Sequence, residues 1–256
     1  MKAQPVLPKF VNEFYLMLAR KTIFSLLLSV SSVALHAQTA DQVISNYIVF
    51  TGGEKSWDKI HSITTSGTYN YGGMEFPFQS WSKAPNLYKY IVKSNDKYFA
   101  QAYDGKQGWK IDGFKGETTK TILEGESAKA MANEADVELE SPFIGYRKKG
   151  FEAIDEGNDT VDGAACYKIK LIKNNNDTST WFFRNTDFAL VKKQAISKNA
   201  ELDNSLLDTY YSDYKVVEGV KFPFKMVSKV NDQTILTIIV TDLQLNVPIP
   251  DNDFKP

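Results

Sequence analysis

The spacing of hydrophobic residues changes along this chain from the period of a helix to the period of β-strands. After residue 39, five apolar side chains recur on one helical face: Ala40, Val43, Ile44, Tyr47 and Ile48. Thr39 and Gln42 have the spacing of a capping box, which satisfies free backbone N–H groups at a helix start. Gly52-Gly53 is a stop signal. The pattern predicts a helix that begins after Thr39 and ends before Gly52.

A period of two follows from Ile63 to Ile122 and returns from Phe151 to Val247. In the first stretch, Met74, Phe76 and Phe78 alternate with residues that suit an exposed face. Tight-turn dipeptides separate the runs: Asp104-Gly105, Asp112-Gly113, Asp162-Gly163, Glu218-Gly219 and Asn231-Asp232. This pattern predicts about ten or eleven hairpin-linked antiparallel strands.

Residues 124–150 interrupt the strands with helical spacing of apolar residues: Ala128, Met131, Ala132, Ala135 and Leu139. Ser141-Pro142 offers a second helix start and Gly150 a stop, so we expect two short helices here. The fold class is then mainly β. We expect one strongly curved antiparallel sheet, a half-barrel, whose concave face is covered by a few short helices that act as plug or lid.

Residues 1–37 have the order of a secretory signal peptide. Basic Arg20-Lys21 precedes an apolar run from Ile23 to Leu35, and small Ala37 closes the segment. The run is shorter than the roughly 20 apolar residues that span a bilayer. We expect translation to start at Met17, cleavage near Ala37, and residues 38–256 to form a single periplasmic domain.

Charge and cysteine content narrow the function. Residues 38–256 carry 26 basic and 30 acidic residues, a balance without general attraction to nucleic acid or to anionic lipid surfaces. Cys166 is the single cysteine, so no intramolecular disulfide can form. No cysteine lies near Ala37, so the mature protein cannot itself become an N-terminally acylated lipoprotein.

A search for catalytic chemistry finds no motif. His61 is the one histidine after Ala37, and a single histidine is more often structural than catalytic. There is no GxSxG elbow, no pair of metal-ligand histidines and no CxxC, and the glycines fall in turns. We therefore expect no catalytic residue, no metal and no cofactor. An enzyme of another type would require polar groups from distant strands to meet in one place.

Aromatic residues are abundant, with 16 Phe, 13 Tyr and 4 Trp, and many fall on the expected strands. Ordinary core packing explains most of them. The functional alternative is that some line an apolar cavity, because a curved sheet too wide to fill its interior must be plugged or must hold a ligand.

Two neighbouring segments, Trp81–Tyr88 and Tyr103–Trp109, resemble the W-x-K-R-P-N-x-F and D-G-K-x-x-W motifs of LolA/LolB-like outer membrane lipoprotein-sorting proteins. Later motifs of the same family are found at Val161-Asp162-Gly163, Tyr211–Tyr214 and Gly219–Pro223. The resemblance covers most of residues 38–256. It implies a half-barrel with a helical lid over a hydrophobic cavity that binds acyl chains of lipoproteins in the periplasm.

The resemblance also suggests site residues and partners. The expected cavity and lid residues are Ile44, Tyr47, Ile48, Phe76, Phe78, Tyr88, Tyr90, Tyr103, Trp109, Met131 and Leu139. The expected partners are lipoprotein acyl chains or other lipid, with membrane-bound donor and acceptor proteins and no nucleic acid, and we expect a monomer. The arginine of the family's K-R-P-N motif is Ala84 here, so a lid lock of that kind cannot be carried over.

The leading hypothesis is a soluble periplasmic carrier for lipoprotein sorting. The alternative is a binding or sensor module on the same fold that recognises another amphiphile or a protein partner without transport. Loss of a carrier should leave lipoproteins in the inner membrane, whereas loss of a sensor should not.

Overall fold

In the computed structural model, strands dominate the described residues, which are 38–138, 141–174, 176–197, 202 and 204–256. Thr39–Pro256 form one unit, and the signal peptide predicted over residues 1–37 lies outside the described residues. Thirteen strands are found in the described part: β1 Ser62–Tyr71, β2 Met74–Lys83, β3 Leu87–Ser94, β4 Lys97–Tyr103, β5 Gly108–Asp112, β6 Thr121–Ile122, β7 Glu152–Val161, β8 Ala164–Ile172, β9 Thr178–Arg184, β10 Leu190–Ile196, β11 Leu206–Val217, β12 Val220–Val230 and β13 Gln233–Leu245.

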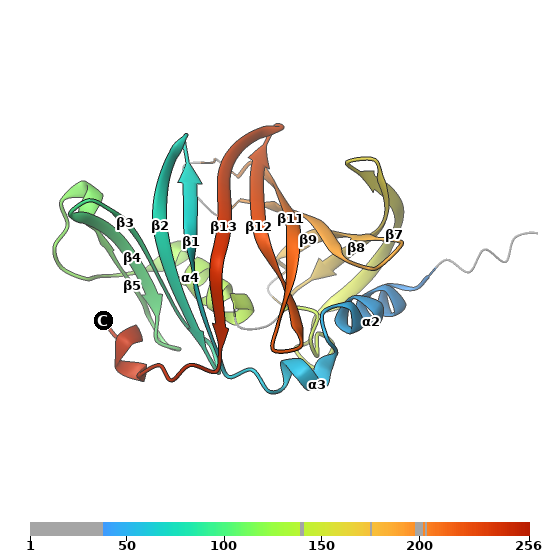
Figure 1. Ribbon diagram of the computed structural model, residues 1–256, viewed down its shortest axis with the longest axis horizontal. Helices are drawn as coiled ribbons and strands as arrows, with labels where there is room; N and C mark the ends of the chain where they lie inside the picture. Colours follow the sequence, from blue (N-terminus) through green and yellow to red (C-terminus); the bar gives the residue numbers. More distant parts are fainter. Residues whose placement is uncertain (1–37, 139–140, 175, 198–201, 203) are drawn as a thin grey trace, which may run out of the picture. The chain divides into compact units, whose positions relative to one another are not determined.

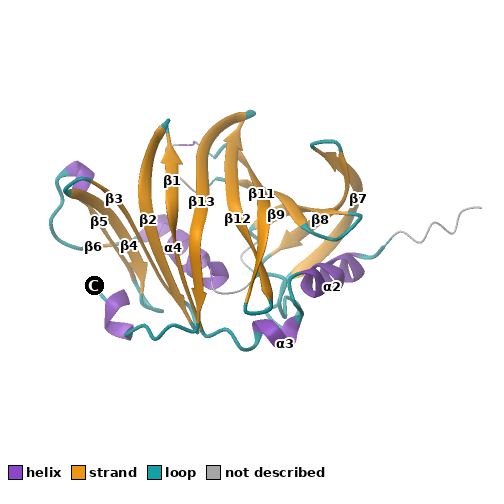
Figure 2. Cartoon of the chain, in the orientation of Figure 1, coloured by secondary structure: helices purple, strands orange, loops and turns teal. Residues whose placement is uncertain are grey.

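All thirteen strands belong to one curved antiparallel sheet (Figures 1 and 2), which confirms the predicted fold class. Its order is β6-β5-β4-β3-β2-β1-β13-β12-β11-β10-β9-β8-β7. The first and last strands therefore pair in the middle, with Ile63 opposite Leu245, and β6 and β7 form the two edges. The sheet has more strands than the pattern predicted, and β6 is only two residues long.

Two-residue turns connect many of the strands, as their dipeptides predict. Asp162-Gly163, Glu218-Gly219 and Asn231-Asp232 all have positive φ at both positions. Such turns match the right-handed twist of paired strands, and Gly, Asn and Asp adopt them at low cost. Short turns of fixed geometry set the register, and the register decides which side chains face each side of the sheet.

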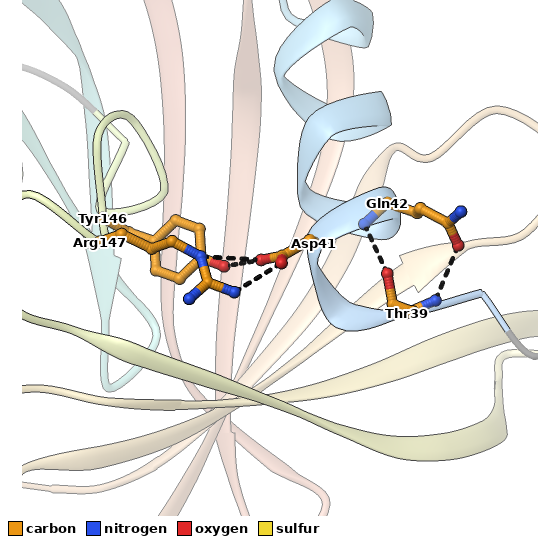
Figure 3. Close-up of polar contacts among 5 residues, drawn as sticks. All are labelled: Thr39, Asp41, Gln42, Tyr146 and Arg147. Atoms are coloured by element: carbon orange, nitrogen blue, oxygen red, sulfur yellow. Dashed lines mark hydrogen bonds and ion pairs between the residues drawn. The ribbon is translucent and has the colours of Figure 1, made fainter.

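Three α-helices and two short 3-10 helices are described: α2 Ala40–Phe50, α3 Glu54–Trp57, α4 Gly125–Glu138, η1 Gly113–Lys115 and η3 Asp251–Phe254. The predicted capping box is present, since Gln42 N donates to Thr39 Oγ1 at 3.3 Å and Thr39 N donates to Gln42 Oε1 at 2.9 Å (Figure 3). α2 ends at Phe50, and its C-cap Thr51 is followed by the predicted Gly52 stop.

The position of α4 follows from the strand order. β6 and β7 are consecutive in sequence but lie at opposite edges, so the chain between them must cross a face of the sheet. α4 makes the first part of that crossing (Figure 1). Residues 142–150 then form successive turns and not the second helix that we predicted. Gly145 has a φ of 58°, a left-handed conformation that interrupts a helix.

Candidate functional site

A cavity of about 550 Å³ lies on the concave face of the sheet, beneath the helices. Most of its lining is aromatic or aliphatic, and the volume falls within the range of roughly 300–1,000 Å³ that is usual for small-molecule sites. Its aromatic residues are Tyr47, Trp57, Tyr69, Phe78, Tyr88, Tyr90, Trp181, Tyr211, Tyr214 and Phe222. They come from α2, α3 and both halves of the sheet.

Strand alternation and register place these residues together. Thr65 on β1 lies opposite Ser80 on β2, which in turn lies opposite Tyr90 on β3, and all three line the cavity. On the other half of the sheet, Trp181 lies opposite Lys193 on β10. Side chains alternate between faces along a strand, so every second residue of these strands contributes to the lining.

α2 and α3 close one end of the cavity, which we call the base. The Tyr47 ring lies 5.7 Å from Phe143 and 5.1 Å from Phe183, between centroids. Trp57 packs against Phe222 at 5.3 Å, and its Nε1 donates to Thr51 Oγ1 at 3.0 Å. These aromatic contacts fix both helices to the sheet.

Two tyrosines of the lining, the buried Tyr47 and the half-buried Tyr214, are neutral near pH 7. Burial raises the pKa of Tyr47 above its ordinary value and raises that of Tyr214 well above it. The Tyr214 hydroxyl donates to the Leu190 carbonyl at 2.8 Å. Since these phenols carry no charge near neutral pH, the base presents an apolar surface with satisfied polar groups.

α4 covers the β3–β4 part of the concave face. Met131 is fully buried and packs in a small cluster with Tyr88, Leu123 and Ala135. Tyr90 and Tyr103 lie partly buried against the same cluster. Glu134, also on α4, lines the cavity. Burial raises the pKa of Tyr69, and the charges of Tyr71 and Glu134 raise it further.

An ion pair joins α2 to the turns at 142–150 (Figure 3). Arg147 donates to Asp41 through Nη2 at 2.5 Å and Nε at 3.3 Å, and the Tyr146 hydroxyl donates to the same carboxylate. Hydrogen bonds from Arg147 and then Tyr146 lower the pKa of Asp41. Two segments that pack against the same core are thereby connected to each other.

Ala84 lies away from this ion pair. Its N–H donates to the His61 carbonyl at 3.0 Å, at the end of β2 near the start of β1. The neighbouring Lys83 points to the outer face, as alternation predicts, and there binds Asp251 at 2.6 Å and the Ile249 carbonyl at 2.7 Å. In this chain, the contact between covering segments is made by Asp41 and Arg147.

The structure separates the predicted site residues into groups. Four of them line the cavity: Tyr47, Phe78, Tyr88 and Tyr90. Four others pack beside it, with Ile44 and Ile48 in the main core and Tyr103 and Met131 in the small cluster under α4. Phe76 lies farther along β2, with its ring 6.0 Å from Phe114. Leu139 lies outside the described residues.

Trp109 is not brought to the cavity. It lies opposite Ala102, on the other side of the sheet from Tyr103, which lies opposite Gly108. Its Nε1 donates to the Phe254 carbonyl at 2.7 Å, so η3 covers it on the outer face. We therefore leave Trp109 out of the site.

The sequence analysis missed the contribution of β9–β13 to the cavity. Its members include Trp181, Tyr211, Met226 and Ile238, together with Lys193. Apolar and polar residues alternate along these strands in the sequence. Which of the two alternating sets of side chains faces the cavity is decided by pairing with other strands, which the alternation alone does not reveal. The charged lining residues are Glu134, Lys173, Asp177, Lys193 and Lys221.

No group of three or more His, Cys, Asp or Glu side chains within the described ranges is arranged to hold a metal ion. No helix in that part of the chain is long and apolar enough to cross a membrane.

Solved structures share this architecture at low sequence identity. A DUF1329 family protein from Desulfovibrio piger matches with a TM-score of 0.58 and 14% identity, over 84% of this chain and 97% of that one. A LolA superfamily protein from Nitrosomonas europaea matches at 0.55 and 12%, over 86% and 99%. An outer membrane lipoprotein-sorting protein domain from Vibrio parahaemolyticus matches at 0.54 and 9%, over 84% and 95%.

At the level of sequence, no protein-family model and no curated protein matches the chain. The likeness therefore concerns the fold, and at that level the predicted resemblance is confirmed. Residues 39–256 have the curved, helix-covered sheet of LolA-like proteins.

Proposed function

We propose that this protein is a periplasmic carrier that binds the acyl chains of lipoproteins, or of other lipid, in the cavity of its sheet. The observation that carries the proposal is the aromatic and aliphatic cavity of about 550 Å³ on the concave face of a LolA-like fold. Moving apolar surface out of water is worth about 0.8 kcal/mol per methylene, so an acyl chain gains greatly from such a lining.

The expected export signal supports a periplasmic location. Cleavage near Ala37 would leave Thr39 close to the new N-terminus, where its capping box begins α2. The mature chain would then start with a segment folded against the base of the cavity.

A matched pair of variants tests acyl binding. Ser80 lines the cavity, whereas Ser212 is exposed on the outer face of β11. Ser80→Trp should fill the cavity and abolish the fluorescence enhancement of N-phenyl-1-naphthylamine, and Ser212→Trp should leave it unchanged. Equal binding of the dye by both variants, or no binding by the native protein, would overturn the proposal.

Carriage is distinguished from binding alone by depletion in cells. If the protein is a carrier, its loss should leave acylated lipoproteins in the inner membrane, measured by fractionation and immunoblotting. Native mass spectrometry of protein purified without detergent should also find a bound acyl species. An unchanged distribution of lipoproteins, with lipid still bound, would favour the sensor alternative.

A further inference from the structure

The two ends of the cavity differ in chemistry. At the base, the lining includes the aromatic rings of Trp57, Tyr47 and Phe222. At the opposite end, which we call the rim, β10 and β12 end and β9 and β11 begin. The head of the β12 arrow marks this end in Figure 1. Phe222 and Ser228 lie six residues apart on β12, so base and rim are separated by about 20 Å of strand.

Lys193 is the cationic residue of the sheet wall near the rim. It lies on β10 opposite Trp181 and Thr209, and its side chain lines the cavity. The Nζ atom lies 5.0 Å from the centroid of the Trp181 ring. A half-buried ammonium against an aromatic wall has lost part of its hydration, so it gains from an anion that enters the cavity.

Hydroxyl groups continue the polar row from Lys193 across the sheet. Thr209 lies opposite Ser228 on β12, with the two Oγ atoms 3.1 Å apart. Ser228 is buried at 7% exposure. Ser179, two residues before Trp181, also lines the cavity. Of these hydroxyl groups, that of Ser179 belongs to a residue of the lining, so the rim offers this hydroxyl and the Lys193 ammonium to the oxygens of a head group.

The other charges of the lining lie around this row. Lys173 and Asp177 face each other at the β8–β9 turn, where Lys173 N donates to the Asp177 carbonyl at 2.9 Å. Glu134 comes from α4, and Lys221 lies near the base with its Nζ 4.3 Å from the Phe50 ring centroid. An ammonium has three N–H donors, so Lys193 can bind a ligand oxygen in addition to its contacts within the protein.

We propose that the cavity binds an acyl amphiphile with an oxyanion at its head, with the tail toward Trp57 and the head at Lys193 and Ser179, which both line the cavity. This inference rests on the proposed function and narrows the ligand class. In a free lipid the oxyanion belongs to the head group. In a lipoprotein it belongs to an acidic side chain beside the acylated residue.

Displacement of N-phenyl-1-naphthylamine by probes with the same tail tests the head group. Hexadecanoate should displace the dye at about tenfold lower concentration than hexadecanol, the factor expected for one charge-assisted hydrogen bond. Lys193→Met should reduce the two probes to equal potency. Lys225→Met, on the exposed outer face of β12, should keep the preference. Equal potency on the native protein, or an unchanged preference in Lys193→Met, would overturn the inference.

Acylated peptides distinguish the two sources of the oxyanion. Palmitoyl-Cys-Asp-Ser amide should bind more tightly than palmitoyl-Cys-Asn-Ser amide if an acidic side chain can supply it. Equal binding of the two peptides, with hexadecanoate still preferred over hexadecanol, assigns the oxyanion to a lipid head group. If none of the C16 probes displaces the dye from the native protein, the proposed function itself fails.

The orientation can be tested without a Lys193 variant. Hexadecanoate brominated near its carboxyl end should quench the fluorescence of Trp181, and hexadecanoate brominated at its tail should quench that of Trp57. Trp57→Phe and Trp181→Phe variants assign the quenched signal, while Trp81 and Trp109 report from the outer face. The reverse order of quenching, or equal quenching by both probes, would overturn the orientation.

Discussion

The two long helices that cover the sheet are attached to it in different ways. α2 buries five side chains in the main core, Tyr47 and Ile44 among them, and is joined to residues 142–150 by Asp41. Among the described side chains of α4, Met131 and Ala135 are buried, in a separate small cluster. The sequence suggested that both helices are lid candidates. Their packing indicates that α2 is a plug within the core and α4 is a cover over the cavity.

The largest effect should come from α2. Ile44 is 2% exposed in the main core, so Ile44→Ala should lower the free energy of unfolding by about 2–5 kcal/mol. Urea denaturation measures this loss. Val49, on the same helix but 69% exposed, is the matched control, and Val49→Ala should change stability by less than about 0.5 kcal/mol. Similar losses of stability in both variants would contradict the conclusion that α2 is a plug within the core.

Met131→Ala should have a smaller and more local effect. A small cluster relaxes around a cavity more easily than a large core, so we expect a loss near 2 kcal/mol, the low end of the usual range. Amide exchange should become faster in α4 while α2 keeps its protection. Hydrogen exchange with mass spectrometry compares the helices, and Lys129→Ala on the exposed side of α4 is the control. An equal increase in the amide exchange rate of α2 would refute the distinction between α2 as a plug and α4 as a cover.

Asp41→Asn should have the smallest effect, because exposed ion pairs stabilise weakly. The folded state lowers the Asp41 pKa, so the contribution of the carboxylate is present above its unfolded pKa of about 4 and is lost as the pH falls through the folded value. Native protein should therefore be more stable than Asp41→Asn at pH 7, and this difference in stability should shrink as the pH falls below about 4, measured by thermal unfolding.

Asp58→Asn, at the exposed end of α3, is the control for this charge change. It should change the stability at pH 7 by less than Asp41→Asn does. A stability difference between native protein and Asp41→Asn that stays constant as the pH is lowered would show that the carboxylate charge is not the cause.

Local sequence signals predicted most of the elements, although not the turns at 142–150, and they did not predict the faces of the strands. Thr39 and Gln42 predicted the start of α2, and glycine-containing dipeptides predicted the hairpins. Trp109 shows the limit. The loop closed by Asp104 N and the Gln107 carbonyl places Gly108, and not Trp109, opposite Tyr103, so the tryptophan points outward. One residue more or less in a turn moves each side chain of the following strand to the opposite face of the sheet.

Long-range pairing was the other unpredictable part. A bulge between Ser66 and Gly67 shifts β1 against β13, and no local pattern reveals that these two strands meet. A Cβ at residue 67 would lie 2.0 Å from the Ile239 carbonyl oxygen, so glycine is required there by a strand from the far end of the chain. The lining from β9–β13 depends on this pairing for its position.

Because β1 pairs with β13 in the centre of the sheet, the cavity can form only after the last strand of the chain is available. A chain that is made or exported from its N-terminus presents β1 early, but its partner arrives with the last strand. Until then β1 and β12 are both open edges, and the apolar faces of the two half-sheets are exposed to water. The closing of this late, sequence-distant contact should be slow, and aggregation competes with it. Ligand binding in this cavity therefore requires the chain to be complete through β13.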